Sequence, residues 1–129
     1  MRGTLQAYKK VSVDSQLQSA SPHKVILMLL NGAIERLVQA KTAMQMGNVA
    51  LKGERLGKAI EIIANLEACL SEDEGLDIAQ NLKQIYEYMQ SQLLKANANN
   101  NPELIDEVSG LLTEIKSAWE AIPSELHYV

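Results

Sequence analysis

The fold of this 129-residue chain is decided by one stretch near its start, Ser19-Ala20-Ser21-Pro22-His23-Lys24-Val25-Ile26-Leu27-Met28-Leu29-Leu30-Asn31-Gly32-Ala33. Ser21 is a predicted N-cap, because its hydroxyl can accept a hydrogen bond from a free backbone N–H, and Pro22 suits the first helical position. Six apolar residues then follow without a break, from Val25 to Leu30, and at about 100° per residue they visit every side of the helix. A helix at the surface of a bundle needs only one apolar stripe. The surplus apolar surface must therefore be covered by something.

The first predicted helix extends from Pro22 to Met46, with Gly47 as its C-terminal cap. Its apolar residues follow the spacing of a bundle seam: Ile26, Leu30, Ala33, Leu37, Ala40 and Met44. Four more apolar or small residues lie together on one flank of the first turns: Val25, Met28, Leu29 and Gly32. If this cluster is exposed, it marks a partner site. If the helix touches two neighbours, the cluster is ordinary core, and periodicity alone leaves both interpretations open.

Three further helices are predicted from the same periodicity and from local start and stop signals. The second runs from Asn48 to Leu70, the third from Leu76 to Ala96, and the fourth from Pro102 to Ile122, where Pro123 stops it. Their core-facing residues are Leu56, Ala59, Ile63, Leu66 and Leu70, then Ile78, Leu82, Ile85, Met89, Leu93 and Ala96, then Leu104, Ile105, Val108, Leu111, Leu112, Ile115, Trp119 and Ile122. Short connections make neighbouring helices antiparallel. The sequence therefore predicts an all-α fold, an antiparallel up-down-up-down four-helix bundle.

The chain is long enough for one domain with its own core, and we expect a single domain over residues 1–129. Residues 22–122 form the predicted bundle, and residues 123–129 form a frayed tail. Residues 1–20 have a mixed pattern in which apolar side chains recur every third position: Leu5, Tyr8 and Val11. We expect these residues to form a short arm that is ordered only when it docks.

Composition excludes several classes of protein. Apolar residues make up 47% and charged residues 22% of the chain, as in ordinary globular proteins. No apolar run approaches the roughly 20 residues that cross a membrane, and Met1 to Gln6 do not resemble a signal segment. Cys69 is the single cysteine, which excludes an internal disulfide and a cysteine metal cluster. We expect a cytoplasmic protein without membrane insertion.

Charge is distributed unevenly along the chain. Residues 1–58 carry nine basic and three acidic side chains, whereas residues 59–129 carry three basic and thirteen acidic ones. This asymmetry can steer a partner toward one side of the molecule. Alternatively, antiparallel helices bring the two halves together and the charges pair. Nucleic acid is not an expected partner, because the net charge is -4 and aromatic residues are few.

No pattern for catalysis or for a metal or cofactor is present. A di-iron bundle needs Glu-x-x-His pairs on facing helices, and neither His23 nor His127 follows a glutamate at that spacing. Glycine-rich phosphate loops and zinc motifs are also missing from the sequence. We expect His23 to be a solvated residue of the first helical turn, and the protein not to be an enzyme. One alternative is a histidine phosphotransfer domain, a four-helix bundle that would use His23 as the phosphoryl acceptor.

A series of short segments, in order along the chain, resembles one known family. The segments are Ala7-Tyr8, Ser19-Ala20-Ser21-Pro22, Leu27-Met28-Leu29, Asn31-Gly32-Ala33, Lys58-Ala59, Ile62-Ile63, Asn81-Leu82, Tyr86-Glu87-Tyr88-Met89, Ala96-Asn97 and Ala118-Trp119. Over about residues 7–119 the chain resembles the flagellin-specific export chaperones, the FliS family.

The resemblance implies a cytoplasmic helical bundle that binds the C-terminal segment of flagellin, prevents premature polymerisation and assists delivery to the flagellar type III export gate. It implies a flagellin-binding groove formed by Val25, Met28, Leu29 and Gly32, with Tyr88 and Met89 as another wall. It also implies an N-terminal cover over part of that groove, carried by Leu5, Tyr8 and Val11. No cofactor is implied.

One departure from the family pattern concerns the core. The family often has Tyr-Asp before Gly-Ala, where this chain has Leu30-Asn31. Leu30 falls on the predicted seam, so the fold should be kept, while this chain lacks the hydroxyl and the carboxylate that the family often has at these positions. A further alternative is a homodimeric structural bundle whose surplus apolar surface joins two copies, and a homodimer could also form when flagellin is absent.

Overall fold

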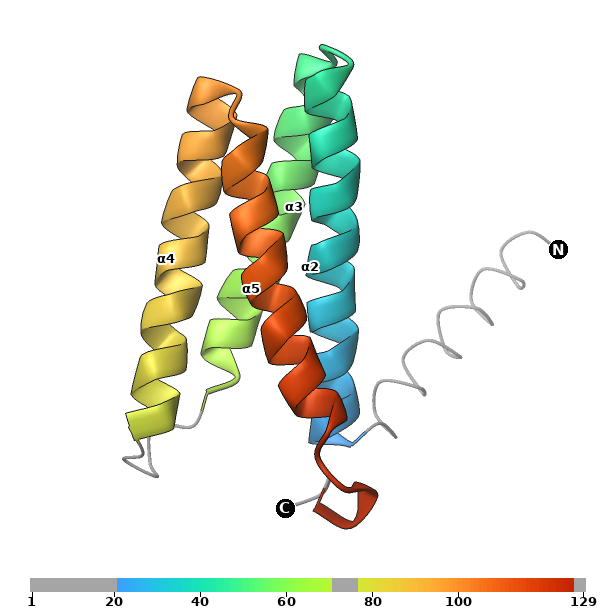
Figure 1. Cartoon of the computed structure of the whole chain (residues 1–129), viewed down its shortest axis with the longest axis vertical. Helices are drawn as coiled ribbons and strands as arrows, with labels where there is room; N and C mark the ends of the chain where they lie inside the picture. The colour runs from blue at the N-terminus through green and yellow to red at the C-terminus, as the bar shows by residue number, and fades with distance from the viewer. Residues whose placement is uncertain (1–20, 71–76, 127–129) are drawn as a thin grey trace, which may run out of the picture.

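The computed structural model describes residues 21–70 and 77–126 (Figure 1), and the predicted arm (residues 1–20) and the connection at residues 71–76 lie outside these ranges. The described residues form the α-helices α2 (Pro22–Gln45), α3 (Val49–Ala68), α4 (Asp77–Asn99) and α5 (Pro102–Glu120), followed by one turn of 3-10 helix, η1 (Ser124–Leu126). Within these ranges no residue is in a β-strand.

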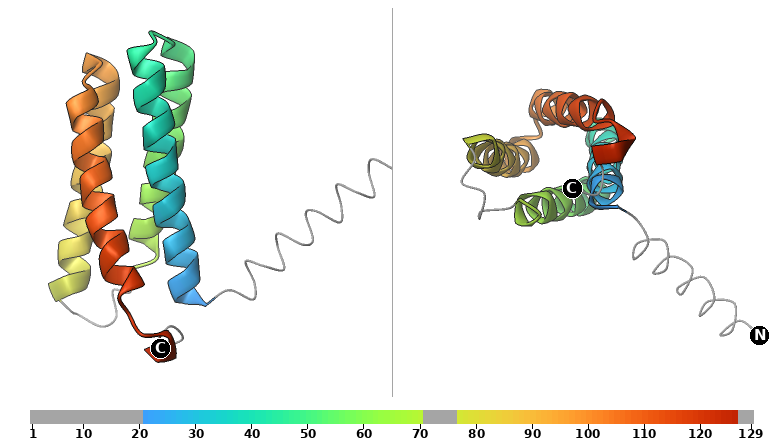
Figure 2. Two further views of the ribbon diagram at one scale, coloured as in Figure 1. Left: turned by 45° about the vertical axis from the view of Figure 1, so that its right-hand side comes forward. Right: turned by 90° about the horizontal axis from the view of Figure 1, so that it is seen from below.

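The four helices are arranged in a ring in which sequence neighbours are space neighbours. α2 packs against α3 and α5, and α4 packs against the same two helices. The α2–α3 turn and the α4–α5 turn lie at the same end of the bundle, at the top of Figure 1, and the end-on view in Figure 2 shows the ring. This arrangement confirms the predicted antiparallel up-down-up-down bundle.

Local capping chemistry explains where the helices start. The Ser21 hydroxyl accepts a hydrogen bond from the Lys24 N–H at 3.1 Å, and Pro22 occupies the first turn as predicted. Asn48 caps α3 through the Leu51 N–H, and Asn101 caps α5 through the Glu103 N–H. Each of these side chains satisfies a backbone donor that the helix itself leaves free.

The helix ends differ from the predictions by a few residues. α3 ends at Ala68 rather than Leu70, and α5 ends at Glu120 rather than Ile122. α4 extends three residues beyond Ala96, to Asn99. Asn100 then adopts a left-handed conformation with φ of 49°, which asparagine tolerates better than most residues. Residues 124–126 form a 3-10 turn where a frayed tail was expected, and residues 127–129 lie outside the described residues.

The core follows the predicted seams closely. Its fully buried residues include Leu30, Ala33, Leu37 and Ala40 from α2, and Leu56, Ala59, Ile63 and Leu66 from α3. α4 contributes Tyr86, Met89, Leu93 and Ala96, and α5 contributes Ile105, Val108 and Leu112. Leu30 has no exposed surface, which confirms its predicted place on the seam. Ile78, by contrast, is exposed, because it lies in the first turn of α4, where the described neighbours do not cover it.

Candidate binding surface

The four residues of the surplus cluster lie on the side of α2 that faces α3. Met28 is 44% exposed, Val25 and Gly32 are partly buried, and Leu29 packs against the edge of the core. A Cβ atom added to Gly32 would lie 3.6 Å from Cδ1 of Ile62 on α3, which is ordinary van der Waals contact. Leu29 thus belongs to the bundle, whereas Met28 is the exposed member of the cluster.

The contact between Gly32 and Ile62 defines the register of α2 against α3. Two antiparallel α-helices have the same rise per residue, so moving forward by one residue on α2 corresponds to moving back by one residue on α3. Residue 36 therefore lies opposite residue 58, and residue 39 opposite residue 55. Ile62 joins the patch, and we call Val25, Met28, Leu29, Gly32 and Ile62 the apolar patch. The sequence analysis did not include Ile62 in the cluster, because its position beside Gly32 depends on the register between two helices.

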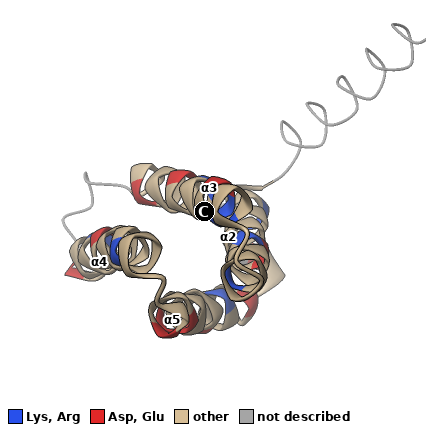
Figure 3. Cartoon of the chain, turned by 90° about the horizontal axis from the view of Figure 1, so that it is seen from above, with Lys and Arg blue, Asp and Glu red and all other residues tan. Residues whose placement is uncertain are grey.

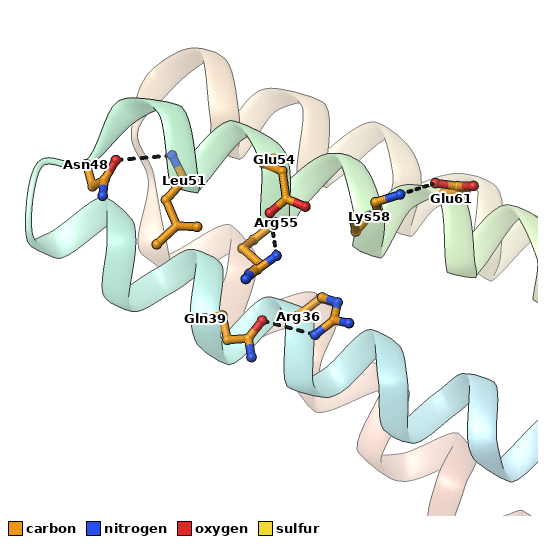
Figure 4. Close-up of polar contacts among 8 residues, drawn as sticks. All are labelled: Arg36, Gln39, Asn48, Leu51, Glu54, Arg55, Lys58 and Glu61. Carbon is orange, nitrogen blue, oxygen red and sulfur yellow. Dashed lines mark hydrogen bonds and ion pairs between the residues drawn. The ribbon is translucent and has the colours of Figure 1, made fainter. Parts of the chain in front are cut away.

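A basic cluster lies directly beside the apolar patch on the same seam. We define it as Arg36 of α2 with Arg55 and Lys58 of α3. Figure 4 shows Arg55 extending from α3 toward α2, where Arg36 and Gln39 lie. Arg55 is paired with Glu54, and Lys58 with Glu61 at 3.6 Å, both on their own helix. Arg36 donates to Oε1 of Gln39 at 3.2 Å and has no carboxylate partner among the described residues.

Tyr88 and Met89 do not lie on this surface. Met89 has no exposed surface and belongs to the core, so the expectation that it lines an open groove is wrong in this structure. Tyr88 is 46% exposed on α4, and its hydroxyl donates to Oε1 of Glu107 on α5 at 2.8 Å. α4 is not a neighbour of α2 in the ring. Tyr88 therefore belongs to a different surface, between α4 and α5.

The contact at Tyr88 is a small polar network. Gln92 donates to the same Glu107 oxygen at 3.0 Å. Hydrogen bonds from Gln92 and then Tyr88 lower the pKa of the Glu107 carboxyl, because they favour its charged form. The hydrogen bond to Glu107 likewise raises the pKa of the Tyr88 phenol, since the bond holds its proton. These contacts join two helices and give no nucleophile or acid–base pair.

The predicted cover of the groove belongs to the N-terminal arm. Leu5, Tyr8 and Val11 lie outside the described residues, so the arm remains an expectation from the family resemblance.

His23 is buried, which corrects the expectation of a solvated side chain. It is 4% exposed, its Nε2 atom hydrogen-bonds the backbone oxygen of Trp119, and the two rings lie 5.2 Å apart. The sequence could not show this contact, because the two residues are 96 positions apart. A phosphoryl acceptor must be reached by a partner protein. The burial of His23 therefore contradicts the phosphotransfer alternative.

Charge remains separated between the two helical hairpins. Residues 21–70 hold six basic and four acidic side chains, and residues 77–126 hold three basic and eight acidic ones. Within these ranges one ion pair joins the hairpins, Lys41 with Asp106 at 2.9 Å. Figure 3 shows charged positions on all four helices. In the described ranges, the expected pairing of the basic and acidic halves occurs at Lys41 with Asp106 between the hairpins and at Lys58 with Glu61 within α3.

No helix of the described part is long and apolar enough to cross a bilayer. No group of three or more metal-binding side chains occurs there either.

A four-helix bundle that exposes an apolar patch beside basic side chains fits the class of proteins that bind other polypeptides through a helical surface. Comparison with known proteins narrows this class. The chain belongs to the flagellar protein FliS family, whose match spans residues 4–126.

Several curated relatives carry the same description. The chain is 60% identical to the flagellar secretion chaperone FliS of Vibrio cholerae over 127 residues, which cover 98% of this chain and 93% of the relative. It is 48% identical to the flagellar secretion chaperone FliS of Salmonella typhimurium, covering 92% and 88%. The protein of that name from Bacillus subtilis is 32% identical, covering 92% and 86%. These relatives support an export-chaperone role, and membership of a chaperone family favours binding over catalysis.

Proposed function

We propose that the protein binds the C-terminal segment of flagellin in the cytoplasm, prevents its premature polymerisation and assists its delivery to the flagellar type III export apparatus. The family match over residues 4–126 supports the export-chaperone role. The choice of flagellin as client rests on the resemblance described above. The choice of surface rests on the apolar patch.

The single observation that carries the choice of surface is Met28. It is the most exposed member of the apolar patch, and its neighbours Val25 and Leu29 extend the same apolar area. Methionine has a flexible thioether side chain that adapts to irregular partners. A client helix can place its apolar face against such a patch, with anchors spaced three or four residues apart.

The energetics suit this mode of binding. A segment that orders on binding loses about 2–5 kcal/mol of the gross interaction energy. Burial of apolar area offsets that loss at about 25 cal/mol per Å². The free energy of binding comes from apolar surface that the client segment buries on the chaperone. This mechanism therefore requires no nucleotide.

The most direct experiment compares two clients. Full-length flagellin and flagellin without its C-terminal segment are titrated with the whole chaperone chain by calorimetry. We expect binding of the first and loss of binding to the second. Equal retention of both flagellins would show that the C-terminal segment is not the ligand.

A matched pair of variants tests the surface. Met28→Glu places a charge in the apolar patch and should weaken flagellin binding more than tenfold, since burying an unpaired carboxylate costs at least about 1.4 kcal/mol. Val38→Glu is the control, because Val38 is 59% exposed on the same helix but outside the patch. It should bind within about twofold of wild type. Thermal melts of both variants should match wild type, and unfolding of Met28→Glu would assign this residue to the core.

The homodimer remains the competing use of the patch. Light scattering of the protein alone and with flagellin distinguishes the two. A stable dimer that flagellin does not disturb, and that Met28→Glu dissociates, would contradict the proposed surface.

A further inference from the structure

The surface along the α2–α3 seam is apolar over one half and basic over the other. The apolar patch lies farther from the α2–α3 turn, and the basic cluster lies nearer to it. The Gly32–Ile62 register makes these two parts adjacent, since Arg36 follows Gly32 by one helical turn on the same side of α2. A partner lying along the seam meets both parts.

The three cations of the cluster are not equivalent. Arg55 and Lys58 each have a carboxylate of their own helix, which neutralises them locally. Arg36 is partly buried, and the amide of Gln39 is its hydrogen-bond acceptor within the described residues. A guanidinium carries five N–H donors in a planar fork that fits a carboxylate, and a partly dehydrated one gains more from such a partner than a solvated lysine does.

We infer that Arg36 is a specificity-determining residue that binds an acidic side chain on the client segment. This inference rests on the proposed function. Met28 and Arg36 are eight residues apart, or about 12 Å along α2 at about 1.5 Å per residue. The client is therefore an amphipathic segment whose Asp or Glu lies about two helical turns from the apolar residue that covers Met28. An apolar client without that carboxylate binds more weakly.

The inference is tested by calorimetric titration of monomeric flagellin into the full chaperone chain at low and high salt. Arg36→Gln should weaken binding about tenfold at low salt and should flatten the salt dependence, because one charge-assisted contact is lost. Arg36→Lys keeps the charge but not the fork, and should lose a smaller part of the affinity. Lys95→Gln removes one positive charge from an exposed position on α4 and should bind within about twofold of wild type.

The outcomes separate this inference from the proposed function. If Met28→Glu weakens binding while Arg36→Gln binds as wild type does, the inference is wrong and the proposed function stands. If wild type does not bind flagellin, both are wrong. Tighter flagellin binding by Arg36→Gln would mean that the guanidinium holds another part of this chain, and a dimer lost in this variant without loss of flagellin affinity would assign it to a second copy. Either result overturns the inference. If Arg36→Gln melts early, Arg36→Lys supplies the decisive comparison.

Discussion

Leu37 lies at the middle of the α2 seam and has no exposed surface. Its side chain packs within a core formed by all four helices. Leu37→Ala should lower the free energy of unfolding by about 2–5 kcal/mol, because the deleted atoms lose their burial and leave a cavity. Urea unfolding followed by circular dichroism measures this loss. A change below about 1 kcal/mol would mean that the core collapses around the smaller side chain.

Tyr86 is the large aromatic residue of the core and is 2% exposed. Burial, and to a smaller extent the charge of a Cys69 thiolate, raises the pKa of the Tyr86 phenol to about 12. The unfolded chain loses this proton near pH 10, at the ordinary value of the group. The contribution of the protonated Tyr86 phenol to the free energy of unfolding is therefore complete below about pH 10. It is lost as the pH rises through about 12.

Absorbance titration of the phenols checks this prediction. The tyrosine transition with the highest pKa should disappear in Tyr86→Phe. If this variant retains the transition near pH 12, another phenol is the buried one.

At the scale of single elements, α3 is the helix with the weakest intrinsic propensity in its first half, since it contains Gly53 and Gly57. Neither glycine has a neighbouring atom within 4 Å of an added Cβ. The two glycines thus do not serve a close helix approach within the described residues.

Gly57→Ala should stabilise the protein by about 0.5–1 kcal/mol, because alanine restricts the unfolded chain and meets no clash in the helix. Gly47→Ala is the opposite case. Gly47 ends the turn between α2 and α3 with φ of +73°, so a Cβ there is strained and stability should fall by about 1 kcal/mol. The melting temperature should rise in Gly57→Ala and fall in Gly47→Ala. A shift of both melting temperatures in the same direction would contradict this account of the two glycines.

At the scale of the whole molecule, two helical hairpins are joined by apolar packing along their length and by polar contacts at both ends. At one end His23 contacts Trp119. At the other end Lys52, which is 6% exposed, donates from Nζ to the Asn97 oxygen at 3.0 Å and to Oδ1 of Asn100. The lysine satisfies carbonyl groups at the C-terminal end of α4, where a helix favours positive charge.

Lys52→Met keeps the apolar stem and removes the ammonium group. We expect a loss of about 1–3 kcal/mol, because the Asn97 oxygen and the Asn100 side chain lose a charged donor. Lys58→Met is the control: its pair with Glu61 is exposed, and such pairs contribute about 0–1 kcal/mol. If both changes lower the free energy of chemical unfolding equally, the hydrogen bonds of Lys52 do not stabilise the contact between the hairpins.

The family resemblance and the structure support different parts of the chaperone interpretation. The ordered series of short segments indicated the family, which comparison with curated relatives confirms. The predicted groove combines four residues on one flank of α2 with Tyr88 and Met89 of α4, and the structure separates these two groups. Met28 lies at the surface of the α2–α3 seam, whereas Met89 lies in the core and Tyr88 lies against α5.

The helices, their order and the residues that face the core, except Ile78, could be predicted from the sequence. Helix starts depend on caps within three residues, such as Ser21 and Asn101, and the seams depend on a period that is visible along the chain. Only the tertiary structure decided the burial of His23 and the place of Ile62 beside Gly32. The physical reason is range: periodicity shows which side of a helix is apolar, but the register between helices decides which parts of that side a neighbour covers.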